Sequence, residues 1–557
     1  MTGKEPNSGL SSRVDIPVPP VRGMHAVKLI VCAGIDSKFM YSFVLMFICF
    51  RLWTLTGAAI FFFRIIRGRV VNLSMKKTNQ LCLDILKLDV HHARALANLV
   101  MAHSSHTGYS VTELCESPVY HYQYSSIADA VNAIAKDKDT LLSFEKQVQA
   151  LCLNHYWSSP PGVPVILQTD KTCVVKRHSP TLEQRKLIAI PNSHIPGNAP
   201  IDIGYEYSFV NLYPGDRSWS LPLSCRNIPT EQTPSQVAAQ QIKDLLQNQD
   251  LPLKDLELIL NNLDSGYANV GYLENTKDLP NLVSILRLRA SSKVHDRATE
   301  SVPNKMKKIY QNRYYLIPKT GVKNYKKHPK TGEPYTVHQT SIFDKTPQKT
   351  LILDYTFSNG RMAKVHLYYW PDLLMRTKQG IKMHDKPFNL LAIQVFDATT
   401  QQLIFKDTMY IAAFGKRKDR IQAEQIYHSY QQRYGIEIFF RFAKQKLSLQ
   451  KYQTCCSQHL HNWMYVISLS SWLLFTANHD LSYFPKKWQK YNASNKSQQC
   501  QNLSMTQAHR SLAAYLLTFD PTPFFPQKSK PGLGRQKGDT QIKRQKYNYV
   551  KKIQNTS

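Results

Sequence analysis

Apolar residues recur with the period of an α-helix in the first well-patterned part of the chain. In the run NQLCLDILKLDVHHARALANLVMAH they lie three and four positions apart, which places them on one face of a helix. Ser110-x2-Glu113 has the spacing of a capping box, and the later run SIADAVNAIAK again has helical spacing. We therefore expect a small helical domain at 75–160.

Between 161 and 289 the pattern changes, because short apolar runs favour strands. VPVILQTD predicts a strand that ends in Asp170, and LELILNNLD predicts one that ends in Asp264. Thr233 followed by proline begins a predicted helix between them. Further strands are predicted at 208–212, 219–225 and 281–289. Three strands, a helix, a strand, a helix and a strand follow one another in the ribonuclease-H-like fold, so we expect an α/β core of that kind.

Residues 290–415 interrupt this order. A basic, tyrosine-rich stretch is followed by the strand-like runs TLILDYTF and AKVHLYYW, and NLLAIQVFD with LIFKDTMYIAAF predicts a hairpin. We expect a mostly β insertion here, after which the core resumes with helices at 416–484. Residues 485–557 are polar, and nine basic residues face one aspartate within 528–552. This composition predicts a basic, disordered tail.

Residues 1–74 contain an unusually apolar segment. The stretch 39–66 is long enough to span a bilayer, but Arg51 lies at its middle, where a charge is costly. A membrane span, a buried helix and upstream sequence outside the working protein are three interpretations, and we do not favour the membrane. Met75 precedes the first convincingly globular stretch and is a candidate internal start.

The net charge of +32 arises from 71 basic and 39 acidic residues. This excess is far larger than solubility requires, so it indicates a polyanionic partner. Nucleic acid is the first candidate, since neutralising phosphates releases counterions, and an anionic membrane surface is the second. The ten cysteines include no CxxC pair, which suits a reducing cytoplasm. Cys455-Cys456-x2-His459-x-His461 matches no common structural zinc site, and a buried helix explains it better.

Four residues of the second core segment recur at helical offsets, in the pattern Tyr430-x2-Arg433-x3-Glu437-x6-Lys444. At about 100° per residue these offsets fall within roughly 60° of one another. Gly435 is a candidate helix breaker, and a break there would leave only Glu437 and Lys444 on one face. A carboxylate beside two cations and a phenol indicates a site for cutting or joining DNA.

This spacing, with ILQTDKT around Asp170 and LDSGYAN around Asp264, resembles the YREK-signature insertion-sequence DDE transposases of bacteria. The resemblance extends from about 80 to 480. It implies an α/β fold whose ribonuclease-H-like catalytic core is interrupted by a β insertion before the third carboxylate. The helical domain at 75–160 would then read the DNA ends of the element, or only pack against the core.

The resemblance implies catalytic and metal-binding roles for Asp170, Asp264 and Glu437. The plainer alternatives are a turn or cap role for each aspartate and, for Glu437, a surface ion pair with Arg433 or Arg441. Two Mg²⁺ ions, for which Mn²⁺ can substitute, would be the cofactors, because such ions activate the attacking oxygen and neutralise the leaving one. Arg433 and Lys444 would contact phosphates at the transposon end. Tyr430 would position the same DNA backbone.

Two further DNA contacts are expected, and each has a plainer alternative. Relatives often carry a tryptophan before the signature block, which stacks on a flipped base. The nearest aromatic residue here is Tyr410, which either stacks or belongs to the core, so the resemblance implies no particular hairpin intermediate. Arg287 and Arg289 either line the DNA channel or form a solvated strand end.

The resemblance thus implies an enzyme that binds the terminal inverted repeats of an insertion sequence, cleaves there in a metal-dependent reaction and transfers the strands to target DNA. Its partners would be double-stranded DNA and a second copy, as a homodimer on paired DNA ends. The setting would be cytoplasmic and nucleoid-associated. The alternative is a catalytically inactive, transposase-derived DNA-binding protein, and the segment 39–66 suggests a membrane-associated basic protein as a third class.

Overall fold

The computed structural model of the protein describes residues 90–550 with gaps. The longer gaps are 107–111, 191–200, 298–309, 326–331, 376–384, 489–502 and 518–537, and shorter gaps of one to three residues lie between them. The apolar segment at 39–66, the candidate start at Met75 and the capping box at Ser110 fall outside the described residues.

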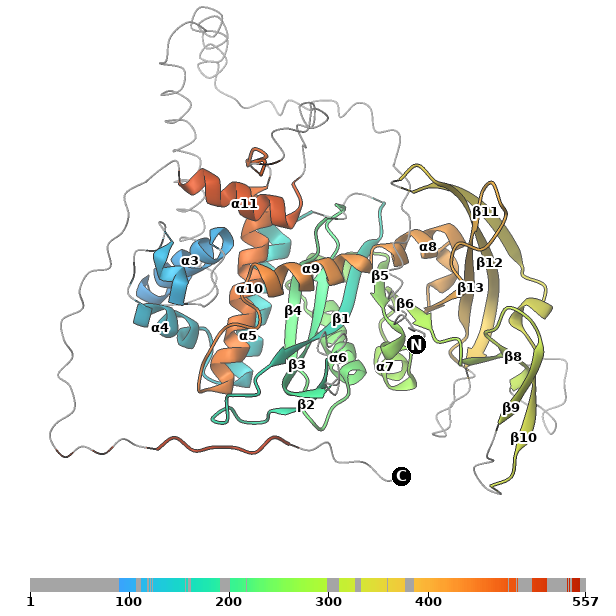
Figure 1. Ribbon diagram of the computed structural model, residues 1–557, viewed down its shortest axis with the longest axis horizontal. Helices are drawn as coiled ribbons and strands as arrows, with labels where there is room; N and C mark the ends of the chain where they lie inside the picture. Colours follow the sequence, from blue (N-terminus) through green and yellow to red (C-terminus); the bar gives the residue numbers. More distant parts are fainter. Residues whose placement is uncertain are drawn as a thin grey trace, which may run out of the picture.

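A mixed sheet of twelve strands runs through the molecule, with helices packed against it (Figure 1). Its first part contains β1 (Val165–Val175), β2 (Lys186–Ala189), β3 (Ile201–Leu212), β4 (Leu221–Asn227), β5 (Ile259–Leu263) and β6 (Leu282–Leu288). β3 pairs antiparallel with β1, β2 and β4, whereas β5 pairs parallel with both β1 and β6. Across the sheet the order is therefore β4-β3-β1-β5-β6, with β2 on the same edge of β3 as β4.

The second part of the sheet comes from the predicted insertion. It contains β7 (Lys293–Arg297), β8 (Tyr310–Tyr315), β11 (Lys349–Thr356), β12 (Met362–Met375), β13 (Phe388–Asp397) and β14 (Met409–Phe414). The predicted hairpin is formed by β13 and β14, and β14 pairs antiparallel with β6, so both parts belong to one continuous sheet. β9 (Gly321–Tyr325) and β10 (Tyr335–Gln339) form a separate two-stranded ribbon.

The helices gather mainly at the β4 end of the sheet (Figure 1). They are α3 (Val90–Ser105), α4 (Tyr124–Ile134), α5 (Lys138–His155), α6 (Pro234–Gln247), α7 (Val270–Thr276), α8 (Ala423–Gln431), α9 (Tyr434–Gln445), α10 (Ser457–Ala477) and α11 (Met505–Leu516). Short 3₁₀ turns are η1 (Thr112–Glu116), η2 (Pro252–Asp255), η3 (Ser265–Tyr267), η5 (Ile342–Asp344) and η6 (Lys418–Arg420). Among the described helices, none combines the length and apolar character that a bilayer crossing requires.

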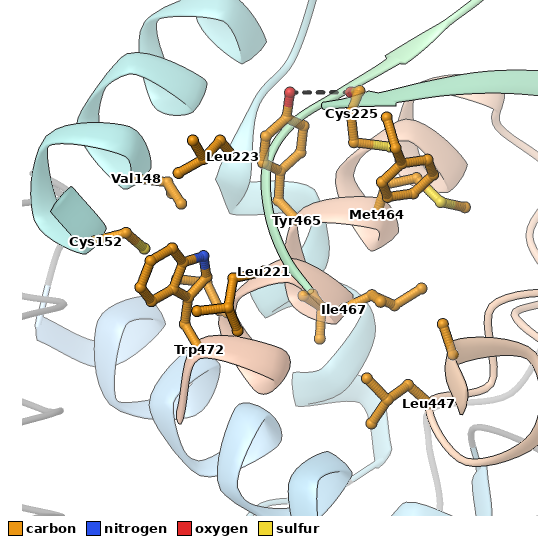
Figure 2. Close-up of a cluster of buried hydrophobic side chains, with 14 of the residues drawn as sticks. Val148, Cys152, Leu221, Leu223, Cys225, Leu447, Met464, Tyr465, Ile467 and Trp472 are labelled. Carbon is orange, nitrogen blue, oxygen red and sulfur yellow. Dashed lines mark hydrogen bonds between the residues drawn. The ribbon is translucent and has the colours of Figure 1, made fainter. Parts of the chain in front are cut away.

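The N-terminal helices share one hydrophobic core with the sheet. A single buried cluster includes residues of α3, α4, α5, β1, β3, β4, α9, α10 and α11. Figure 2 shows part of it, with Val148 and Cys152 of α5, Leu221 and Leu223 of β4, and Trp472 of α10. The Trp472 indole donates a 2.8 Å hydrogen bond to the Pro222 carbonyl, which fixes α10 against β4. The predicted helical domain is therefore seated directly on the core.

The start of α6 follows its sequence signals. Thr233 accepts a hydrogen bond from the Gln236 backbone N–H at 3.3 Å, and the Gln236 side chain accepts one from the Thr233 backbone N–H at 2.8 Å. Pro234 occupies the first helical position, where no N–H is needed. The predicted helix is confirmed.

The prediction that the whole of 485–557 is disordered is wrong for two described segments. The first is α11, which begins with a capping box between Ser504 and Gln507 and buries Met505, Leu512 and Leu516. The second is the stretch 543–550, which hydrogen-bonds to the Pro180 and Arg185 carbonyls. The polar composition of the tail masks an apolar helix face and a backbone pairing that side-chain chemistry does not signal.

A buried ion network joins four elements. Glu145 of α5, with 1% of its side chain exposed, accepts hydrogen bonds from Ser224 at 2.9 Å and from the Tyr465 phenol at 2.5 Å. Arg226 of β4 pairs with Glu145 and, at 2.5 Å, with Asp244 of α6. Since Tyr465 lies on α10, this carboxylate links α5, β4, α6 and α10.

Replacing Glu145 should therefore destabilise the fold strongly. Glu145→Ala leaves Arg226 with a buried and incompletely compensated charge, so we expect the free energy of unfolding to fall by about 3–5 kcal/mol. Asp139→Ala, on the exposed first turn of the same helix, removes an equal charge and should cost less than about 1 kcal/mol. Denaturant unfolding of both variants measures the difference, and similar losses would show that the network is not stabilising.

Candidate functional site

Asp170 and Asp264 lie side by side because of the register between β1 and β5. The last paired residues of this parallel ladder are Thr169 and Leu263, so the two aspartates are the next residue on each strand. β5 ends there, but β1 continues to Val175 against β3. The prediction that the first strand ends in Asp170 is therefore wrong, since the longer pairing with β3 extends it. Asp170 instead marks the point where the ladder with β5 ends.

The signature block forms two helices rather than one. α8 ends at Gln431 and α9 begins at Tyr434, while Gln432 and Arg433 keep right-handed helical dihedral angles between them. The break thus lies before Gly435, which is inside α9. Glu437 and Lys444 share α9, and Tyr430 belongs to α8.

Buried amide side chains attach this helix junction to the two strands. Gln168 of β1 donates to the Gln432 carbonyl and accepts a 2.5 Å hydrogen bond from the Ser220 hydroxyl. Asn262 of β5 donates to the Ser429 carbonyl at 2.7 Å and accepts from the Ser429 hydroxyl at 3.2 Å. Gln168 lies two residues before Asp170, and Asn262 lies two residues before Asp264. These hydrogen bonds therefore hold the α8–α9 junction to β1 and β5 close to the two carboxylates.

Gly435 allows α9 to approach β1 closely. A Cβ atom at this position would lie 2.8 Å from Nε2 of Gln168, closer than van der Waals contact permits. Gln168 is fully buried and held at both ends of its amide, so it has little freedom to move aside. The glycine therefore serves the packing of the helix and does not end it.

The Arg433 guanidinium connects two of the three carboxylates. Its Nη1 lies 3.2 Å from Oδ2 of Asp170, and its Nη2 lies 2.5 Å from Oε1 of Glu437. The guanidinium carbon is 6.0 Å from the centre of the Tyr430 ring. Since Asp170 adjoins Asp264 across the sheet, three acidic residues and one arginine gather at this end of β1 and β5.

The charges of this group act on one another. Burial raises the pKa of Asp170 to about 6, and Arg433 opposes that rise. The negative charges of Asp264 and Glu437 reinforce the rise. Burial alone would lower the pKa of Arg433, but the neighbouring acidic groups raise it above its usual range.

The remaining side chains of the signature adjoin the same group. Burial raises the pKa of Tyr430 to about 12. Burial lowers the pKa of Lys444, while the charges of Cys173 and Asp170 oppose that decrease. All four residues predicted from the signature thus lie within electrostatic range of Asp170.

Arg287 and Tyr410 lie on opposite faces of the sheet. Arg287 is exposed on β6, opposite Ile411 of β14, and its charge acts on the Tyr430 phenol. Tyr410 pairs with Leu288 instead and is only 2% exposed, within the core. Tyr410 is therefore a residue of the hydrophobic core, on the face opposite to Arg287, because adjacent strand residues face opposite ways. Arg289 is exposed just beyond β6.

Sequence reasoning missed the amides that hold the site. Gln168, Asn261 and Asn262 are fully buried within strands that otherwise read as apolar. A signal for them existed, because amides inside an apolar strand need partners, but the partners could not be named. Tyr267, on the turn after Asp264, was not assigned a role either. Burial raises its pKa, and the charge of Asp170 adds to this.

Carboxylate oxygens are the donors that Mg²⁺ and Mn²⁺ prefer, so the chemistry of Asp170, Asp264 and Glu437 fits such an ion. In the part of the chain that the structure describes, however, no three His, Cys, Asp or Glu side chains are grouped tightly enough to hold a metal. Arg433 supplies positive charge between Asp170 and Glu437.

His461, the last residue of the run that begins at Cys455, contacts the Tyr207 phenol at 2.7 Å.

Comparisons with known proteins provide no identity for the chain: no family model matches it, and no curated protein matches it.

The close approach at Gly435 generates a testable coupling. Gly435→Ala should lower the free energy of unfolding by about 1–3 kcal/mol, because the new methyl group overlaps Gln168. Gln168→Ala removes that neighbour, so the double variant should lose less than the sum of the two single losses. Gly266→Ala is the control, since nothing lies within 4 Å of its Cβ position. Strictly additive losses would show that the two residues do not limit each other.

Proposed function

We propose that this protein is a DDE transposase of the YREK-signature type. It binds the terminal inverted repeats of an insertion sequence, cleaves DNA strands there and joins them to target DNA. The observation that carries the proposal is the gathering of Asp170, Asp264 and Glu437 around Arg433. A resemblance based on short sequence blocks does not require such proximity, because Asp170 and Glu437 are 267 residues apart in the chain.

The strand order supports a ribonuclease-H-like core. In that fold a three-stranded antiparallel meander is followed by two parallel strands, and the first strand occupies the centre. The order β4-β3-β1-β5-β6, with antiparallel pairing on one side of β1 and parallel pairing on the other, follows this arrangement. The insertion enters after β6 and returns to α8, which precedes the helix that carries Glu437.

The side chains around the carboxylates suit a phosphodiester substrate. Divalent ions held by Asp170, Asp264 and Glu437 would supply activation of the attacking oxygen and charge compensation at the leaving oxygen. Arg433 offers a planar pair of donors for a phosphate, and Lys444 offers a compact charge beside it. Exposed Arg287 and Arg289 extend the positive surface along β6.

The proposed partners follow from the same chemistry. A net charge of +32 favours double-stranded DNA as the ligand, both at the element ends and at the target. Joining of paired ends requires two active sites, so we propose a homodimer on DNA in a nucleoid-associated, cytoplasmic setting.

Strand cleavage of DNA that carries the ends of the gene's own locus tests the function. With Mg²⁺ or Mn²⁺, the wild type should nick at the ends, whereas Glu437→Gln should lose at least about 100-fold in rate while binding DNA normally. Asp170→Ala and Asp264→Ala should behave in the same way. Binding without cleavage by the wild type would instead indicate an inactive DNA-binding relative. Equal loss of binding in all three variants would contradict the metal-binding roles.

The phosphate contact assigned to Lys444 has its own test. Lys444→Ala should make the dependence of log K on log salt concentration shallower by about 0.9, the value of one lost phosphate contact. Lys254→Ala is the matched control, because this exposed lysine precedes β5, at the end remote from Asp264. Equal slopes for the wild type and Lys444→Ala would remove this lysine from the DNA contacts.

A further inference from the structure

The described tail segment 543–550 is held against the loop before β2 and against the first residue of β2. The Tyr547 backbone N–H donates to the Pro180 carbonyl at 2.8 Å, and the Val550 N–H donates to the Arg185 carbonyl at 2.6 Å. Val550 also forms a parallel bridge with Lys186 of β2. The tail therefore satisfies the Pro180 and Arg185 carbonyls, which lie in the loop before β2.

Arg185 provides a dedicated anchor for the segment 543–550. Its Nη2 donates to the Tyr547 carbonyl at 2.9 Å, while the rest of the guanidinium binds the carbonyls of Leu182, Lys176 and Arg177 at 3.2–3.3 Å. The residue is only 5% exposed. A buried guanidinium that donates to four backbone carbonyls is suited to holding one segment of chain in a fixed place.

The anchored segment presents cations to solvent. Lys543, Arg544 and Lys546 are all exposed, and no ion pair joins them to another described residue. Attachment through the main chain and Arg185 leaves their side chains available to a ligand. The chemistry of three neighbouring cations on one anchored segment matches a row of phosphates.

The strand registers place Val550, next to these cations in the chain, at a defined distance from Asp170. Asp170 and Val175 lie on β1, and Val175 pairs with Gly204, which pairs with Lys186 next to Val550. Five residues along β1 advance about 17 Å, and three strand spacings add about 14 Å sideways. Val550 is therefore about 22 Å from Asp170, and the three cations lie four to seven residues before it in the chain.

We propose that residues 543–550 form a fixed DNA-backbone contact, held by Arg185 at the β2 edge of the sheet that carries Asp170. This inference rests on the proposed function and adds a specific, ordered contact to it. A tail that remained a free polycation would bind phosphates without a fixed position. The anchored segment instead sets where along the duplex the charge is applied.

Salt titration of binding to a 30-base-pair duplex by the full-length protein tests the contact. Combined Lys543→Gln, Arg544→Gln and Lys546→Gln substitution should make the log–log salt dependence shallower by about 2.7, as expected for three phosphates. The control removes three exposed cations near the opposite ends of β5 and β6, at Lys254, Lys277 and Lys416, and should leave the slope nearly unchanged.

The backbone attachment of the segment is tested first by a substitution that removes no charge. Tyr547→Pro deletes the N–H that binds the Pro180 carbonyl, and it should lose at least about one unit of salt slope together with amide-exchange protection at Val550. Asn548→Pro is the matched control, because no backbone bond from its N–H to a described carbonyl is present. Arg185→Ala should reduce the salt slope and the Val550 protection in the same way. Because Arg185→Ala could also disturb folding around β2, the Tyr547→Pro variant, which changes only the tail, shows whether loss of the attachment alone is enough.

The outcomes distinguish this contact from the proposed function. A shallower salt dependence of DNA binding in the triple variant but not in Tyr547→Pro would mean that the tail acts as a free polycation, and it would overturn the inference. No change in the salt slope of either variant would also overturn it. If the wild type itself fails to bind DNA, the proposed function fails first.

Discussion

The parallel register between β1 and β5 is the constraint on which the candidate site depends. It ends at Thr169 and Leu263, and so brings two aspartates together that are 94 positions apart in the chain. Because backbone hydrogen bonds set this register, a slip of one residue would turn each side chain to the other face of the sheet. The long antiparallel pairing of β1 with β3 resists such a slip.

A second constraint couples Glu437 to the same strands. The amides of Gln168 and Asn262 bind backbone carbonyls at and just before the α8–α9 break, so the helix cannot shift along the sheet without breaking buried hydrogen bonds. Arg433 then neutralises part of the negative charge that this arrangement concentrates. Buried amides set the position, and the guanidinium makes the position electrostatically tolerable.

Local signals predicted local structure, and non-local pairing explains the rest. Thr233 and Pro234 predicted the start of α6 because capping depends on neighbours in sequence. The extension of β1 beyond Asp170 depends on β3, and the core position of Tyr410 depends on pairing with β6, which no window of neighbouring residues contains. The four signature residues were predicted to share a face, and they do adjoin one another, although a helix break that the pattern does not show separates them. Whether they act on DNA stays a prediction.

The continuity of the sheet through β6 and β14 has a mechanical consequence. An inserted domain that is joined by loops alone can rotate about those loops. Here a ladder of backbone hydrogen bonds between β6 and β14, from the pair Ser284 and Phe414 to the pair Leu288 and Tyr410, leaves no hinge between the two parts. The insertion and the carboxylates therefore behave as one stiff platform. A ligand long enough to touch both must bend or twist to match a surface whose curvature is already set.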